Sequence, residues 1–121
     1  MTKILIIEDD YALADNLSAL LKLKGYDVQF AADGEAGIEA ARKFQPDVVL
    51  LDIMIPKVGG FDACRIMRSD AKTKNAKVVM MTGLDRMGDV EKAFSCGATD
   101  YLIKPFDSER LFKKLEKVLR T

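Results

Sequence analysis

Histidine is absent from the 121 residues of this chain, and its absence excludes several kinds of chemistry. Ser-His-Asp and Cys-His nucleophilic mechanisms, and zinc proteases of the HExxH type, all need an imidazole. A function that requires a phosphohistidine on this chain is excluded for the same reason. Any chemistry must therefore rely on carboxylates, hydroxyls, lysines or a bound metal.

Cysteine and long hydrophobic runs are also scarce. Cys64 and Cys96 are far apart in the sequence and form no CxxC pair, so we expect reduced thiols in or near the core rather than a disulfide framework or a zinc site. No apolar run approaches the roughly 20 residues of a membrane span. The chain begins with a strand-like KILIIE rather than a basic and apolar signal segment. We therefore expect a cytoplasmic protein without membrane association.

Size and charge set further limits. With 49% apolar and 31% charged residues, residues 1–121 are expected to form one packed domain. The net charge is zero, but residues 1–60 carry a net charge of −4 and residues 61–121 one of +4. Basic groups without interleaved aromatics or a nucleic-acid motif do not indicate direct nucleic-acid binding. We expect a solvated helix face, part of which docks a protein partner, at Lys113, Lys114, Lys117 and Arg120.

The hydrophobic pattern alternates between strand and helix along the chain. Short runs rich in Val, Ile, Leu, Phe or Tyr predict strands at residues 3–8, 27–32, 47–52, 77–82 and 99–103. Helical spacing of apolar residues predicts a first helix from about Leu13, a last helix from about Leu111, and helices at about 34–44, 60–70 and 87–95. Strands that alternate with crossover helices form a parallel sheet, so the sequence predicts a doubly wound α/β domain.

Several residues have the chemistry of helix caps. Asp33 and Asp107 stand where N-caps belong, and Gly25 and Gly97 follow the expected ends of helices. Asp10 directly precedes the first helix, which favours an N-cap over a metal ligand.

Chemically active residues cluster at the expected carboxyl ends of the strands, where doubly wound sheets bind their ligands. Converging carboxylates repel one another by up to about 4 kcal/mol per pair at ~4 Å and an effective dielectric near 20, unless they share a cation. Oxygen ligands without His or Cys favour a hard ion such as Mg²⁺. A lysine, a hydroxyl and a metal around one aspartate describe a phosphoryl site. The residues concerned are Glu8, Asp9, Asp52, Thr82 and Lys104.

Four motifs then point to a known family. KILIIEDD, PDVVLLDIMIP, VVMMTG and GATDYLIKPF occur in this order and resemble the receiver domains of two-component response regulators, the CheY type. The resemblance covers essentially the whole chain. It implies a flavodoxin-like (βα)5 fold with five parallel strands in the order 2-1-3-4-5. It also implies a signalling switch that catalyses only its own phosphorylation and dephosphorylation, not an enzyme with a diffusible substrate.

The resemblance implies a phosphoacceptor and a metal site. Asp52 resembles the residue that accepts the phosphoryl group, and Asp9 the direct ligand of Mg²⁺, for which Mn²⁺ can substitute. Glu8 resembles the acid that reaches the metal through water, and the main-chain carbonyl of Met54 would complete the protein ligands.

The resemblance to receiver domains also implies a response to phosphorylation. Thr82 would hydrogen-bond the phosphoryl oxygen, Gly83 would leave that oxygen room, and Lys104 would pair with it after a cis peptide bond to Pro105. Tyr101 matches the aromatic that turns inward when Thr82 moves, although a half-buried strand aromatic that serves only packing would look the same.

Partners follow from the same resemblance. The phosphoryl donor would be a sensor histidine kinase or a His-containing phosphotransfer protein. We expect the output protein or domain, or a second copy of the chain on phosphorylation, to dock on the face formed by the fourth helix, fifth strand and fifth helix.

The sequence departs from the family pattern at three positions. Gly59 replaces a common Asp or Asn, which we expect to change turn geometry only. Met54 and Leu84 are apolar where polar groups can orient water for hydrolysis, so we expect a long-lived phosphoryl group.

Two other functions fit the topology less well. A flavodoxin-like redox module would need a Gly/Ser/Thr-rich phosphate loop, where this chain has EDDYALAD. An aspartyl phosphatase would need a second Asp at the position of Met54. A receiver-shaped module that is never phosphorylated is disfavoured because every catalytic position is filled.

Overall fold

The computed structural model describes residues 1–83 and 87–120, which form one five-stranded sheet and five helices. All strand pairs are parallel, and the strand order is β2-β1-β3-β4-β5. This confirms the predicted doubly wound fold and its strand order. The strands are β1 (Lys3–Ile7), β2 (Asp27–Ala31), β3 (Val48–Asp52), β4 (Lys77–Thr82) and β5 (Asp100–Ile103). The helices are α1 (Tyr11–Leu23), α2 (Gly34–Phe44), α3 (Gly60–Arg68), α4 (Met87–Ser95) and α5 (Ser108–Leu119).

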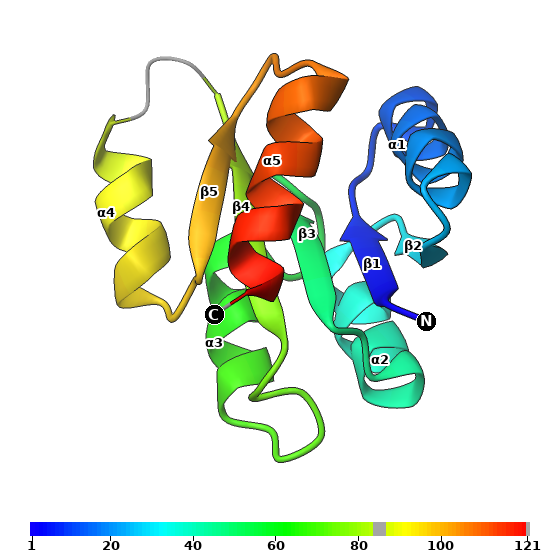
Figure 1. Ribbon diagram of the computed structural model, residues 1–121. Coiled ribbons are helices and arrows are strands. Elements are labelled where there is room, and N and C mark those ends of the chain that lie inside the picture. Colours follow the sequence, from blue (N-terminus) through cyan, green and yellow to red (C-terminus); the bar gives the residue numbers. More distant parts are fainter. Residues whose placement is uncertain (84–86, 121) are drawn as a thin grey trace.

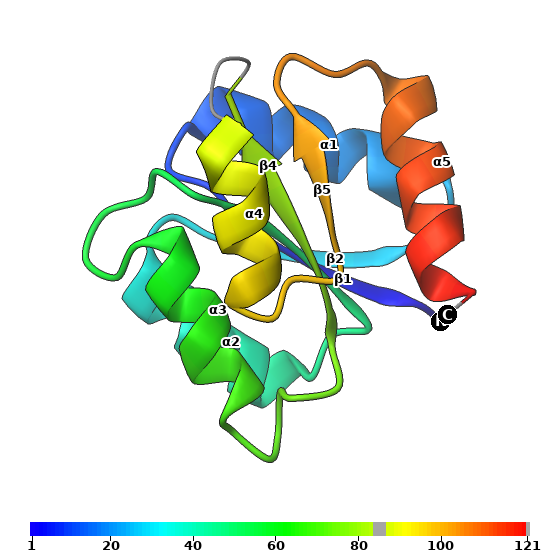
Figure 2. The same cartoon turned by 90° about the vertical axis from the view of Figure 1, so that its left-hand side faces the viewer.

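The helices cover both faces of the sheet. Helices α1 and α5 lie on one face, and α2, α3 and α4 lie on the other (Figures 1 and 2). Strand residues alternate between the two cores, as a pleated strand requires. In β1, Ile4 and Ile6 pack towards α1 and α5, whereas Leu5 and Ile7 pack towards the other three helices. The central strands are therefore buried on both faces, which explains their continuously apolar sequences.

The two cysteines lie in the core, as predicted, and so do two adjacent methionines of β4. Cys64 and Cys96 are buried, unpaired thiols in the core beneath α2, α3 and α4. Burial raises the pKa of the Cys64 thiol to about 11, so this cysteine is a poor nucleophile at neutral pH. Met80 and Met81 are fully buried, one in each core.

The predicted helix caps are confirmed. Asp10, Asp33 and Asp107 each accept a hydrogen bond from a backbone N–H in the first turn of α1, α2 and α5. Gly25 and Gly97 have φ of +88° and +99° just after α1 and α4, where a residue with a side chain would be strained. No helix among the described residues is long and apolar enough to cross a membrane.

Helix α3 begins at Gly60, as predicted, but ends earlier than expected. Gly59 has an ordinary φ of −64° and is the N-cap of α3, without a side-chain acceptor. Gly59 thus leaves α3 without a side-chain cap, and its expected effect on turn geometry stays a prediction. The helix also ends at Arg68, and Ser69 caps its carbonyls through its backbone N–H.

Candidate functional site

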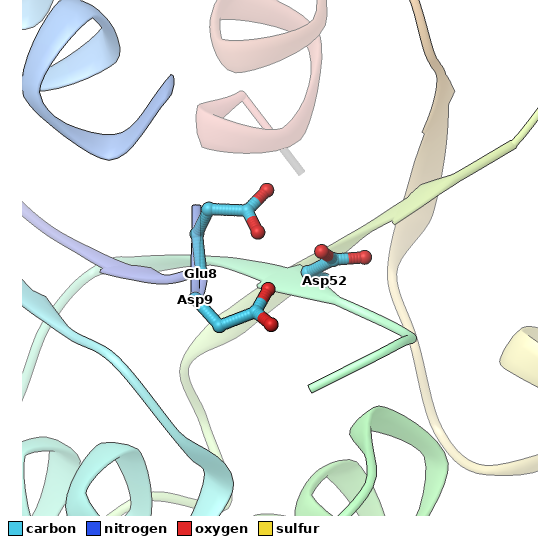
Figure 3. A group of neighbouring side chains, drawn as sticks. All are labelled: Glu8, Asp9 and Asp52. Carbon is cyan, nitrogen blue, oxygen red and sulfur yellow. The ribbon is translucent and has the colours of Figure 1, made fainter. Parts of the chain in front are cut away.

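Three carboxylates converge at the carboxyl edge of the sheet (Figure 3). Glu8 and Asp9 follow β1, and Asp52 is the last residue of the neighbouring strand β3. The two strands pair in register up to Ile7 and Leu51, so their ends are side by side. One carboxylate oxygen from each acid lies within 4.8 Å of the others. The sequence prediction that these acids meet is correct.

Lys104 brings a cation into this cluster. Its ammonium donates to Glu8 Oε1 over 2.7 Å and to Asp52 Oδ2 over 3.1 Å. The lysine follows β5, and its peptide bond to Pro105 is cis, as predicted. The sequence placed Lys104 at the site but did not show that it links the two acids, because these contacts span 96 and 52 residues of the chain.

The electrostatics of the cluster favour a further cation. Glu8 is 2% exposed, and burial together with the nearby Asp52 raises its pKa to about 7 despite the hydrogen bond from Lys104. Burial acts to lower the pKa of Lys104, but the contacts with Glu8 and Asp52 outweigh it and raise that pKa. One ammonium therefore balances three carboxylates only in part. An all-oxygen donor set with unbalanced negative charge fits Mg²⁺.

The other predicted site residues surround Asp52. Met54 donates its backbone N–H to Asp52 Oδ1 over 3.2 Å, while its side chain is largely exposed. Thr82 ends β4, the strand next to β3, and is 3% exposed. Its hydroxyl donates to the carbonyl of the exposed Gly83 over a long 3.5 Å. Leu84, which also departs from the family pattern, lies outside the described residues.

Tyr101 lies on β5 in a network that the sequence did not predict. The half-buried ring packs edge-to-face against Phe94 of α4, with centroids 5.9 Å apart. The ammonium of Lys114 lies 5.2 Å from the ring centroid and also donates to Asp100 Oδ1 over 3.0 Å. Lys117 pairs with the other Asp100 oxygen over 3.1 Å. This network joins β5 to α5 through the predicted switch residue.

The buried Asp100 predicts a pH-dependent contribution to stability. Burial acts to raise its pKa, but the Tyr101 N–H and the two lysines outweigh it and lower the pKa below 3.8. A lowered pKa stabilises the fold above 3.8, and the contribution is lost as pH falls through the folded-state value. We expect Asp100→Asn to cost about 1 kcal/mol of unfolding free energy at pH 7.

Urea unfolding of wild type and Asp100→Asn between pH 7 and pH 3 measures this effect. The difference between the two proteins should be constant down to about pH 5 and shrink below about pH 4. A difference that grows as pH falls would contradict the assignment.

The fold and the site together define a class of protein. A doubly wound parallel sheet that gathers acids, a lysine and a threonine at its carboxyl edge is suited to phosphoryl chemistry. The family model for the response regulator receiver domain matches residues 4–116. The chain belongs to this family, the phosphoacceptor switches of two-component systems.

Individual response regulators are also similar to this chain in sequence and in structure. The DNA-binding dual master transcriptional regulator RpaA of Synechocystis is 45% identical over 120 residues, which are 99% of this chain and 50% of that protein. This chain therefore spans about half the length of that relative. A putative response regulator from Chloroflexus aurantiacus has a similar structure, with a TM-score of 0.94 and 31% identity over 99% of this chain and 98% of that one.

A third similar protein carries a metal. The receiver domain of the sensor histidine kinase PA1611 from Pseudomonas aeruginosa was solved with a magnesium ion coordinated in its active-site cleft. It is 28% identical with a TM-score of 0.91, over 99% of this chain and 98% of that one.

Proposed function

We propose that Asp52 is the phosphoacceptor of this receiver domain and that Lys104 and Thr82 bind the incoming phosphoryl group. The observation that carries the proposal is the contact of Lys104 with both Glu8 and Asp52. A lysine beside a nearly buried aspartate can exchange a carboxylate oxygen for a phosphoryl oxygen with little movement. The donor we propose is a phosphohistidine on a sensor kinase or a phosphotransfer protein.

The side chains divide the work of transfer. An oxygen of Asp52 attacks the phosphorus; an O–P bond forms, the P–N bond breaks, and the imidazole leaves with the partner and takes a proton from water. Lys104 keeps its charge beside the transferred oxygens, since its pKa is raised. Among the described residues, the Thr82 hydroxyl has only the long contact to Gly83 to give up before it donates to the phosphoryl group. These new bonds favour a second arrangement around Thr82 and Tyr101.

The metal we propose is Mg²⁺, with Mn²⁺ as a substitute. Asp9 and Asp52 would bind it directly, Glu8 through water, and the main-chain carbonyl of Met54 would complete the protein ligands. When bound, the ion would neutralise charge on the carboxylates and on the phosphoryl oxygens.

Removal of the metal tests this proposal. Incubation with a small acyl phosphate and Mg²⁺ should add one phosphoryl group to the chain, as measured by intact mass. Excess chelator should prevent the addition, and excess Mg²⁺ should restore it. Equal phosphorylation with and without chelator would refute the metal requirement.

We also propose that the domain hydrolyses its own phosphoryl group slowly. The Met54 side chain is 64% exposed beside Asp52 and has no polar group with which to orient water. The double substitution Met54→Asn, Leu84→Glu should shorten the phosphoryl half-life about tenfold, less than the roughly 10²- to 10⁴-fold effect of a general acid or base, because the new groups only orient water. Loss of the phosphoryl group after donor removal, followed by mass, measures the rate. An unchanged half-life would contradict the proposal.

The partner surface we propose is the face formed by α4, β5 and α5. Phe94 is 47% exposed on this face, beside Tyr101. A hollow of about 340 Å³ lies between β5 and the basic residues of α5. We propose that residues 1–121 act in the cytoplasm as one receiver unit. An output protein or domain, or a second phosphorylated copy, docks on this face, and any DNA contact belongs to the output part.

A further inference from the structure

We propose that Gly34, the first residue of α2, is a positioning residue for the metal site. It admits the loop of residues 53–59 into space that a side chain would occupy, and that loop carries Met54. The inference rests on the proposed function, because it concerns the Met54 carbonyl as a ligand.

The first contact lies at the amino end of α2. Gly34 donates its N–H to the Pro56 carbonyl over 3.1 Å. A Cβ on Gly34 would overlap the Val58 carbonyl oxygen and lie 2.8 Å from the Val58 Cβ. These two Val58 atoms belong to the backbone or are bonded to it, so they cannot move aside as the end of a flexible side chain could. A side chain at position 34 must displace the loop or the helix.

The far end of the loop is held in the same way. Gly60 donates its N–H to the Ile53 carbonyl over 3.0 Å. A Cβ there would lie 2.5 Å from the Asp52 carbonyl oxygen and 2.6 Å from the Ile53 Cα. The loop is thus packed between α2 and the end of β3, and cannot shift towards β3 to relieve a clash at Gly34.

Helix α2 has little room to move towards β1. A Cβ on Gly37, one turn along the helix, would lie 2.5 Å from the Ile7 side chain of β1. Ile7 directly precedes Glu8 and Asp9, the two acids of the proposed metal site that follow β1. Helix α2 therefore sets the spacing between these ligands and the Met54 loop. Displacing the loop should move the Met54 carbonyl while the three carboxylates remain.

The test is Mg²⁺ binding by isothermal titration calorimetry on the whole chain. Gly34→Ala should weaken Mg²⁺ affinity by roughly 10- to 100-fold, the range for residues that orient metal ligands. The matched control is Gly59→Ala in the same loop, where an added Cβ has nothing within 4 Å and affinity should be unchanged. A lower unfolding free energy for Gly34→Ala with unchanged Mg²⁺ affinity would make its role purely structural and overturn the proposal.

A second measurement needs no variant and covers the case in which Gly34→Ala does not fold. In the wild-type chain, hydrogen exchange of the Gly34 amide should slow when Mg²⁺ is added, because the metal and this hydrogen bond stabilise the same loop arrangement. Exchange that is independent of Mg²⁺ would overturn the inference. A wild-type chain that binds no Mg²⁺ would instead overturn the proposed metal site and this inference with it.

Discussion

Asp52→Asn should abolish phosphorylation of this chain by a small acyl phosphate in the presence of Mg²⁺. The amide is almost the same size as the carboxylate but lacks the negative charge that makes an aspartate a nucleophile. Asp52 is 7% exposed and accepts hydrogen bonds from Met54 and Lys104, so the amide should occupy the same position. Intact mass after incubation with the donor should show no added phosphoryl group.

Asp27→Asn is the matched control for this experiment. Asp27 is exposed at the start of β2, at the edge of the sheet opposite the carboxylate cluster. This variant should accept the phosphoryl group as the wild type does. Phosphorylation of folded Asp52→Asn to the wild-type level would show that another residue is the acceptor.

Arg68→Met should cause a large loss of stability. The guanidinium joins the end of α3 to two loops: it donates to the carbonyls of Gly97, Lys74 and Ala76 and to the hydroxyl of Thr99. Hydrogen bonds from a charged donor are stronger than neutral ones, and the carbonyls of Gly97 and Ala76 would lose this donor in partly buried surroundings. We expect a cost of about 3 kcal/mol and a fall in Tm of about 10 °C.

Arg65→Met separates this effect from the mere loss of a positive charge on α3. Arg65 forms an ion pair with Asp62, three residues earlier in the same helix, and both side chains are more than half exposed. Such a pair contributes about 0.5 kcal/mol or less. Thermal and urea unfolding of the two variants should therefore differ widely. Equal stability of both would contradict the role given to Arg68.

Much of the fold could be predicted because its strands are unusually apolar. Strands β1, β3 and β4 are buried on both faces, so their continuous Val, Ile, Leu and Met runs stood out from the amphipathic helices. Helix boundaries were clear where an aspartate provides a cap, as at Asp33 and Asp107. The end of α3 was not clear, because Ser69 caps it through backbone atoms that leave no mark in the sequence.

The site could be predicted in its residues but not in its contacts. Parallel strands bring their carboxyl ends together, so Glu8, Asp9 and Asp52 had to meet once the strands were known. The link from Lys104 to two of these acids depends on the path of the chain after β5. The close approach of Gly34 to Val58 depends on how a helix and a loop pack. Neither has a local sequence pattern that could predict it.

The most direct test of the account is the position of the phosphoryl group on the wild-type chain. After incubation with an acyl phosphate and Mg²⁺, borohydride reduction converts a phosphorylated aspartate into a residue that peptide mass spectrometry can locate. We predict this change at Asp52 and at no other acid. Reduction at Asp9 or at another carboxylate, or a stable phosphoester on a hydroxyl, would contradict it.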